Sequence, residues 1–253
     1  MVLKEVILLV GHGSRDADGN QEFMEFVEAV RKVVPNREIE ACFLELASPA
    51  IDAGITTCVQ HGATRIFAVP VILLAAMHVK DEIPEFLEKG RQLYPQVEIV
   101  YGKNVGQHAK ILELLQERFY EVMVQPTVIG ASFSDTAVVL MGRGSSDVTA
   151  NGDLYKIARM LWERLGVMTV ETCFSGITAP LLPEGVGRAI ALGAKRVVVV
   201  PYFLFTGVLI KRMRQVLDEV QREYPEIQMA MSKYLGVHHL LIDALVEQIE
   251  GEW

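Results

Sequence analysis

The chain contains the same pattern of residues twice, and this repeat limits what it can fold into. The matched segments lie about 131 positions apart in a sequence of 253 residues. They pair GHGSRDADGN at Gly11 with GRGSSDVTAN at Gly142, EACF at Glu40 with ETCF at Glu171, and GATRIFAVP at Gly62 with GAKRVVVVP at Gly193. A repeat of this length indicates one architecture that is built twice, so both copies are expected to fold alike.

Within each copy, short β-branched runs alternate with longer segments of helical period, which is typical of a parallel sheet covered by helices. Strands are expected at 5–11, 38–45, 65–71 and 97–101, and then at 136–142, 168–174, 195–202 and 226–231. Helices are expected near 20–34, 48–61, 78–93 and 106–121, and then near 152–166, 180–192, 207–224 and 236–250. The sequence therefore predicts an α/β protein with two similar lobes, each a four-stranded parallel sheet flanked by helices.

The domain boundaries are predicted from the repeat. We expect one lobe over residues 1–123 and a second over 136–253. The segment 124–135, which contains Pro126 and Gly130, is expected to be the linker. Ligands of parallel sheets bind beyond the carboxyl ends of the strands, so the site is expected there, in a cleft where two similar lobes clamp a flat ligand.

Composition excludes several classes of partner. The formal charge of −8 and the isoelectric point near 5.3 argue against a nucleic-acid surface, because phosphate binding needs clustered cations. The apolar runs are too short for a membrane span or an export signal. Three cysteines without CxxC spacing fit buried free thiols in a reducing compartment. We expect a cytoplasmic protein with no nucleic-acid or membrane partner, working as a monomer because one chain has both halves of the cleft.

The repeat also supplies an internal control, because residues needed only for the fold should be kept in both copies. Three first-copy residues differ in chemistry from their counterparts: His12 against Arg143, Glu45 against Gly176, and His78 against Leu209. Each follows a different predicted strand, and neighbouring strands lie about 5 Å apart, so the three side chains can converge on one ion. Two imidazoles and a carboxylate can bind a divalent first-row metal and leave positions open, and imidazoles also accept protons near neutral pH.

Other polar residues near these strand ends are candidates for binding the carboxylates of a ligand. The candidates are Ser14, Arg15, Lys80, Arg143, Ser145 and Ser146. The alternative for the charged members is solvated charge in the first turn of a helix. His61 is expected to lie at the surface, and His108, which has a counterpart in His238, is expected to have a structural or capping role.

Five motifs in this order resemble one family of enzymes. They are VGHGSR at Val10–Arg15, FLEL at Phe43–Leu46, VPVILLAAMHVKDEIP at Val69–Pro84, GRGSSD at Gly142–Asp147 and VPYFLFTGVL at Val200–Leu209. The set is similar to the sirohydrochlorin chelatases (SirB/CbiX) of the class II chelatase group. The resemblance implies a chelatase-like fold with two Rossmann-like lobes and a metal held by His12 and His78 with Glu45 assisting. It also implies insertion of a divalent ion into sirohydrochlorin, a carboxylate-rich tetrapyrrole, without ATP or an organic cofactor.

The same resemblance bears on the identity of the ion. Some cobalt enzymes of this type carry a His-rich or iron–sulfur-binding tail, whereas this chain ends in Gly251, Glu252 and Trp253. Fe²⁺, giving siroheme, is therefore the expected ion, with Co²⁺ on the cobalamin route and Ni²⁺ as alternatives.

Three other functions fit parts of the pattern. A dinucleotide-binding oxidoreductase would have a Gly-rich turn after the first strand, but GHGSRD lacks the third glycine of GxGxxG and His12 would project where the pyrophosphate binds. A non-catalytic metal carrier or sensor would use the same three donors. A histidine phosphotransferase is disfavoured because no arginine directly precedes His12.

Overall fold

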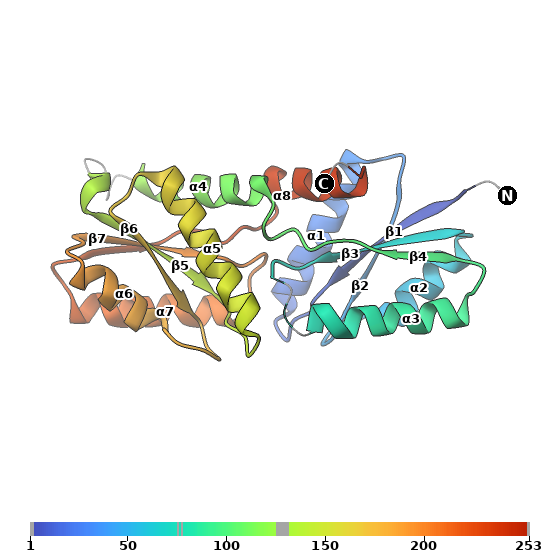
Figure 1. The fold of residues 1–253 in the computed structure, drawn as a ribbon, viewed down its shortest axis with the longest axis horizontal. Helices are drawn as coiled ribbons and strands as arrows, with labels where there is room; N and C mark the ends of the chain where they lie inside the picture. The colour runs from blue at the N-terminus through green and yellow to red at the C-terminus, as the bar shows by residue number, and fades with distance from the viewer. Residues whose placement is uncertain (1–2, 75, 77, 125–131, 252–253) are drawn as a thin grey trace. The chain divides into compact units, whose positions relative to one another are not determined.

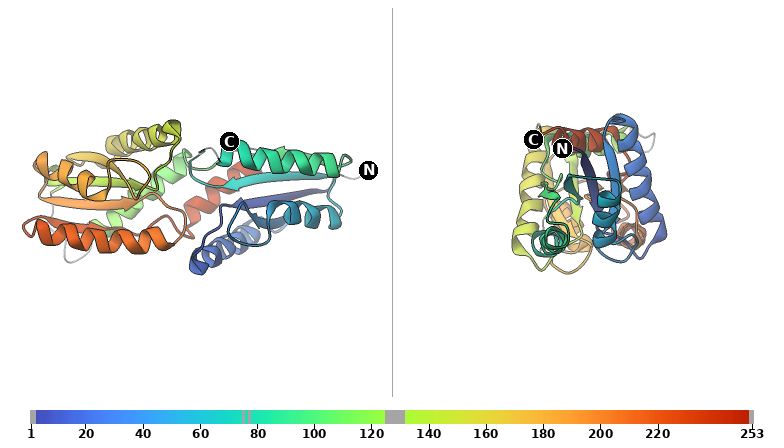
Figure 2. Two further views of the ribbon diagram at one scale, coloured as in Figure 1. Left: turned by 90° about the horizontal axis from the view of Figure 1, so that it is seen from below. Right: turned by 90° about the vertical axis from the view of Figure 1, so that its right-hand side faces the viewer.

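The structure is a computed structural model of the chain, and it describes residues 3–74, 76, 78–124 and 132–251. It contains two four-stranded sheets, in which all the paired strands are parallel, with helices on both sides of each sheet (Figure 1, Figure 2). The predicted α/β fold class and the predicted sheet in each copy are confirmed.

The first copy forms the sheet with strand order β2-β1-β3-β4. Its elements are β1 (Glu5–Gly11), α1 (Ala17–Val33), β2 (Glu38–Phe43), α2 (Ile51–Gln60), β3 (Arg65–Val71), the π-helical turn η1 (His78–Glu82), α3 (Ile83–Leu93), β4 (Glu98–Tyr101) and α4 (Ala109–Met123). Strand β1 pairs with β2 on one side and β3 on the other. The carboxyl ends of these three strands therefore lie together at one edge of the sheet.

The second copy repeats this topology with strand order β6-β5-β7-β8. Its elements are the short 3-10 helix η2 (Phe133–Asp135), β5 (Thr136–Gly142), α5 (Val148–Leu165), β6 (Thr169–Phe174), α6 (Leu182–Ala191), β7 (Arg196–Pro201), α7 (Val208–Glu223), β8 (Gln228–Met231) and α8 (His239–Ile249). The same residue pattern has therefore produced the same order of strands.

The central strand of each sheet is buried because helices cover both of its faces. In the first copy Val6, Leu8 and Val10 of β1 pack in one core with Ile55 of α2 and Leu87 of α3. An equivalent core lies between β5 and the helices α6 and α7. The unbroken apolar runs of these strands are the expected pattern for parallel strands buried on both faces.

Two helices begin earlier than the sequence predicts, because an aspartate caps each of them. The Asp16 side chain accepts a hydrogen bond from the Asp18 amide, so α1 begins at Ala17 instead of near residue 20. In the second copy Asp147 accepts from the Thr149 amide, and α5 begins directly after it. The connection from each central strand to its helix is consequently only a few residues long.

The last helix of each copy belongs to the compact unit formed by the other copy. Unit 1 comprises Met1–His108 with Val237–Trp253, and unit 2 comprises Ala109–Gly236. In unit 2, the buried Arg118 side chain of α4 donates to the carbonyl oxygens of Tyr234 (2.9 Å) and Leu235 (2.6 Å). Helix α4 runs beside α5, whereas α8 runs beside α1 in unit 1 (Figure 1).

These units differ from the lobes that the repeat predicts at 1–123 and 136–253. The periodic spacing of apolar residues in a helix indicates that one of its faces is buried, but it does not indicate which sheet covers that face. Hydrogen bonds between elements carry that information, and the repeat alone does not. Residues 125–131 of the predicted linker 124–135 lie outside the described residues.

Among the helices that the structure describes, none is both long enough and apolar enough to cross a lipid bilayer.

Candidate metal centre

The backbone beyond β1 and β2 brings His12 and Glu45 together. The ladder between the two strands ends where Gly11 pairs with Phe43. Two further hydrogen bonds extend it, because the Leu44 amide donates to the Gly11 carbonyl (2.8 Å) and the Glu45 amide donates to the His12 carbonyl (3.1 Å). The two candidate donors are therefore held opposite each other at the edge of the sheet.

The side chains of His12 and Glu45 lie close enough to share an ion. Nδ1 of His12 is 3.6 Å from Oε1 of Glu45 and 3.2 Å from the carbonyl oxygen of Gly13. Two donors bound to one ion at about 2.1 Å each are themselves about 3.0–3.4 Å apart, so little adjustment would be needed. The His12 side chain is 26% exposed and that of Glu45 is 44% exposed, so an ion can reach both from solvent.

The loop after β1 approaches the loop after β2 so closely that position 13 must be glycine. Gly13 has a φ of 89°, and a Cβ atom on it would lie 1.8 Å from the carbonyl oxygen of Glu45. Gly144 has the same φ of 89° in unit 2, where its Cβ would lie 2.2 Å from the Gly176 carbonyl oxygen. The backbone of the loop is therefore the same in both units, although only unit 1 has the imidazole and the carboxylate.

His78 follows β3, the strand on the other side of β1, and it begins the π-helical turn η1 at the start of the segment predicted as a helix over 78–93. The His78 side chain lies outside the described part of the structure, so its place beside His12 and Glu45 stays a prediction. Lys80 is exposed in the same turn, and its amide donates to the Ala76 carbonyl.

Two of the serines expected to bind carboxylates, Ser14 and Ser145, take part in a backbone clamp that sequence reasoning missed. Ser14 donates its amide to the Asn20 side chain (2.8 Å), and that side chain donates back to the Ser14 carbonyl (2.9 Å). Ser145 and Asn151 form the same pair of bonds. Because both asparagines are conserved between the two copies of the repeat, comparing the copies could have found them, and the shared clamp supports a structural role for each loop.

Three of the remaining carboxylate-binding candidates, Arg15, Arg143 and Ser146, are exposed in the same loops. The Arg143 carbonyl accepts a hydrogen bond from the Ser175 hydroxyl at 3.1 Å, which fixes the loop backbone. The role of these side chains toward a ligand stays a prediction.

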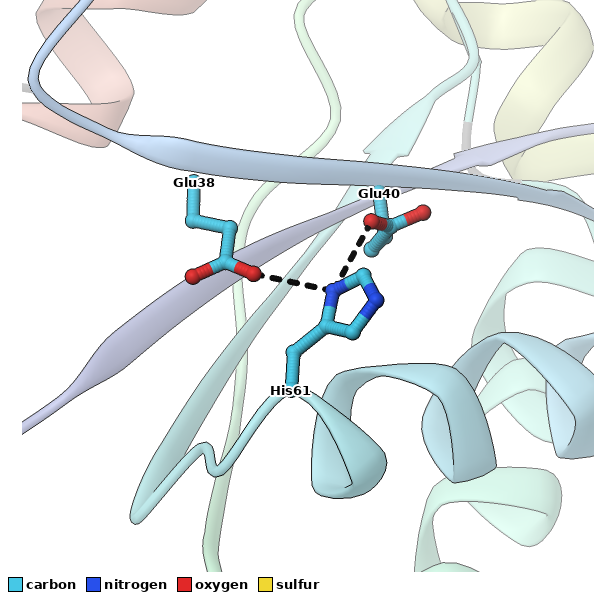
Figure 3. Close-up of side chains that lie close together, drawn as sticks. All are labelled: Glu38, Glu40 and His61. Carbon is cyan, nitrogen blue, oxygen red and sulfur yellow. Dashed lines mark ion pairs between the residues drawn. The ribbon is translucent and has the colours of Figure 1, made fainter.

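A second group of donors lies near the other end of β2 (Figure 3). Nδ1 of His61 is 2.9 Å from Oε1 of Glu38 and 3.2 Å from Oε1 of Glu40, and these three residue types could ligate a metal ion. However, the Lys4 ammonium lies 2.9 Å from Oε2 of Glu38, and that hydrogen bond holds the pKa of Glu38 below its usual range. This group is an ion-pair network that already contains a cation, and His61 is exposed as predicted.

The other predicted histidine and cysteine roles are confirmed. Buried His108 lies with its Nε2 3.0 Å from Oε2 of Glu247, and His238 caps α8 by accepting from the Leu240 amide. All three cysteines are buried free thiols, and burial raises the pKa of Cys58 to about 12. Thiolate ligands are therefore not offered by such residues near neutral pH.

Comparisons with known proteins identify the family to which the chain is similar. The sequence profile of the CbiX family matches residues 6–122 and again residues 137–252. A sirohydrochlorin cobaltochelatase of Priestia megaterium is 43% identical over 245 residues, covering 96% of this chain and 78% of the relative. A sirohydrochlorin ferrochelatase of the same organism is 38% identical over 246 residues, covering 97% and 90%.

A solved structure is also similar over almost the whole chain. SirB from Bacillus subtilis with Fe³⁺ has a TM-score of 0.85 at 33% identity, covering 98% of this chain and 95% of that one. With the family profile matched once in each copy and with relatives similar along nearly the full length, this chain belongs to the CbiX/SirB family of sirohydrochlorin chelatases.

Proposed function

We propose that this protein inserts a divalent metal ion into sirohydrochlorin, a metal-free tetrapyrrole, as a sirohydrochlorin chelatase. The observation that carries the proposal is the approach of His12 Nδ1 to Glu45 Oε1, 3.6 Å apart at the carboxyl edge of the first sheet. The second copy has the same loop backbone but has Arg143 and Gly176 at these positions. A metal-binding role explains why only one copy keeps the donors.

The chemistry of metal insertion suggests a role for each donor. As the ion enters the ring, two pyrrole N–H protons leave, so the product is the metallated ring and two protons. We propose that His12 and His78 present the ion and accept these protons, and that Glu45 is a ligand or a proton relay. The imidazoles bind the ion through nitrogen lone pairs, and each lone pair is freed to accept a proton when the ion moves to the ring nitrogens.

The chemistry of the donors suits more than one ion. Imidazole and carboxylate ligands bind Fe²⁺, Co²⁺ and Ni²⁺ alike, with affinity rising in that order. Full-length relatives are named for iron and for cobalt. We propose Fe²⁺ as the physiological ion, with Co²⁺ as the alternative. Because affinity alone would favour the later metals, the supply of each metal in the cell has to contribute to the choice.

The test mixes the protein anaerobically with sirohydrochlorin and with Fe²⁺, Co²⁺ or Ni²⁺ in turn, and follows the absorption spectrum. Wild-type protein should accelerate metallation, and His12→Ala should lose most of that acceleration while keeping its circular dichroism. His61→Ala is the matched control, since it removes an exposed histidine of the same unit with two carboxylates beside it. Tight metal retention without metallation would support a metal carrier or sensor instead.

A further inference from the structure

The residue after Glu45 has a strained backbone. Leu46 has a φ of 63°, and the Ala47 amide donates to the Glu45 carbonyl at 2.8 Å, which closes a three-residue γ-turn around it. A γ-turn whose central φ is positive is the rare and strained form. Large side chains seldom adopt such a φ, because their Cβ atom approaches the neighbouring carbonyl oxygen.

The same strained turn is present in unit 2. Ile177 has a φ of 67°, and the Thr178 amide donates to the Gly176 carbonyl at 2.8 Å. Isoleucine is β-branched, so it fits this backbone even less well than leucine does. The shared backbone indicates that the turn itself belongs to the fold, and both copies place a large aliphatic residue at its centre.

Packing of the fold does not account for these side chains. Leu46 is 52% exposed and Ile177 is 69% exposed, so neither contributes fully to a core. Glycine or asparagine would adopt the turn with less strain and would expose no aliphatic surface to water. Strain of this kind is retained where the surroundings hold it for a function, and the observed outlier points to a role for the side chain itself.

The position of Leu46 in the chain indicates the kind of ligand that its side chain could contact. It directly follows Glu45, whose carboxylate lies 3.6 Å from His12, and the backbone of this loop is bonded to the His12 carbonyl. A tetrapyrrole that receives a metal from these donors brings a flat apolar ring to the same place, with its carboxylates at the periphery. Exposed Arg15 and the other polar candidates suit the carboxylates, whereas an exposed aliphatic side chain suits the apolar ring.

We propose that Leu46 is a substrate-binding residue that contacts the apolar ring of the tetrapyrrole beside the metal donors. The strained turn holds its side chain exposed before the substrate arrives, so less conformational freedom is lost on binding. The inference rests on the proposed function, because it takes the tetrapyrrole as the ligand of this loop.

The test uses Leu46→Asn, which keeps nearly the same size, tolerates a positive φ and removes the aliphatic surface. Binding of metal-free sirohydrochlorin is measured by quenching of its fluorescence without added metal, and stability is measured by thermal unfolding. We expect the Kd to rise about tenfold, since most of one aliphatic contact is lost. The unfolding midpoint should stay the same or rise by about 2–4 °C as the strain is relieved.

Two further variants separate binding from folding. Leu46→Met keeps an aliphatic contact and should bind with nearly wild-type affinity. Leu93→Asn replaces another exposed leucine, at the end of α3, and should leave the Kd unchanged. Ile177→Asn should raise the unfolding midpoint in the same way as Leu46→Asn, which shows that both turns are strained.

Each outcome bears on the proposal. An unchanged Kd in Leu46→Asn, or a Kd that rises equally in Leu93→Asn, would overturn it, and so would a midpoint that falls in Leu46→Asn. If the wild-type protein binds and metallates sirohydrochlorin and Leu46→Asn does so equally well, only this inference is wrong, and the proposed function is unaffected. A wild-type protein that neither binds nor metallates it removes both.

Discussion

The α-carbon of Gly13 lies against the carbonyl oxygen of Glu45, so closely that a Cβ atom would be 1.8 Å from it. This contact joins the loop that carries His12 to the loop that carries the carboxylate. The two proposed metal donors are therefore positioned by backbone contacts as well as by their own side chains, and a change that alters neither donor can still separate them.

Gly13→Ala should separate the donors and destabilise unit 1. The new methyl group would clash with the carbonyl oxygen and would also face a φ of 89°, so we expect a loss of about 2–4 kcal/mol in the free energy of unfolding. Chemical denaturation measures this loss, and a Co²⁺ titration should show weaker binding. Gly62→Ala is the control, since Gly62 has a φ of 83° with no atom within 4 Å and should cost only about 1 kcal/mol.

Removing the charge of Glu45 should weaken metal binding more than it weakens folding. Glu45→Gln keeps the shape of the side chain but removes a charged oxygen donor, and we expect Co²⁺ affinity to fall about 10- to 100-fold. The absorption bands of bound Co²⁺ report this directly. Glu40→Gln alters a carboxylate of β2 that lies beside His61 instead, and equal losses in both variants would contradict the assignment of the metal centre.

The network around Glu38 should add stability that depends on pH. The hydrogen bond from Lys4 and the nearby His61 hold the pKa of Glu38 below its usual range in the folded protein. Its contribution is therefore complete above the unfolded pKa of about 4.3 and is lost as the pH falls through the lowered folded value. Glu38→Gln should destabilise the protein more at pH 7 than near pH 3.

Urea denaturation at the two pH values measures the difference, and Lys4→Met should show the same dependence because it removes the other member of the pair. An equal loss at both pH values would mean that Glu38 acts through packing. Neither variant should slow metal insertion, since the network lies at the other end of β2 from Glu45.

Arg118 should stabilise unit 2 although it belongs to the first copy of the repeat. Arg118→Ala leaves the carbonyl oxygens of Tyr234 and Leu235 without this donor, which should cost about 1–3 kcal/mol. Trp162 lies in unit 2, and with the other tryptophan, Trp253, replaced by Phe, its fluorescence can follow unfolding of that unit. Arg31→Ala, which removes a donor to the Ile39 carbonyl in unit 1, is the comparison and should have less effect on this signal.

The sequence predicted the parts of the fold and the site that depend on local pattern. Strands follow from apolar runs, and the comparison of copies singled out His12 and Glu45, which the structure brings together. The same comparison gave His108, through its counterpart His238, a structural or capping role, and His238 caps α8. These predictions work because a residue type and its position along a strand already decide which edge of the sheet it reaches.

Features that depend on specific tertiary contacts could not be predicted in this way. The clamp between Ser14 and Asn20 spans six residues of loop, and no periodicity reports it. The strained turn at Leu46 runs against the usual preference of leucine, so propensity would place the residue elsewhere. The exchange of α4 and α8 depends on which sheet each helix packs against, and the two similar copies offer each helix two similar surfaces.

That exchange has a consequence for how the chain can be divided. The first copy supplies α4 to unit 2 and the second copy supplies α8 to unit 1, so a cut between the copies would separate each of these helices from its unit. We therefore expect that neither copy, expressed alone, reproduces one complete compact unit.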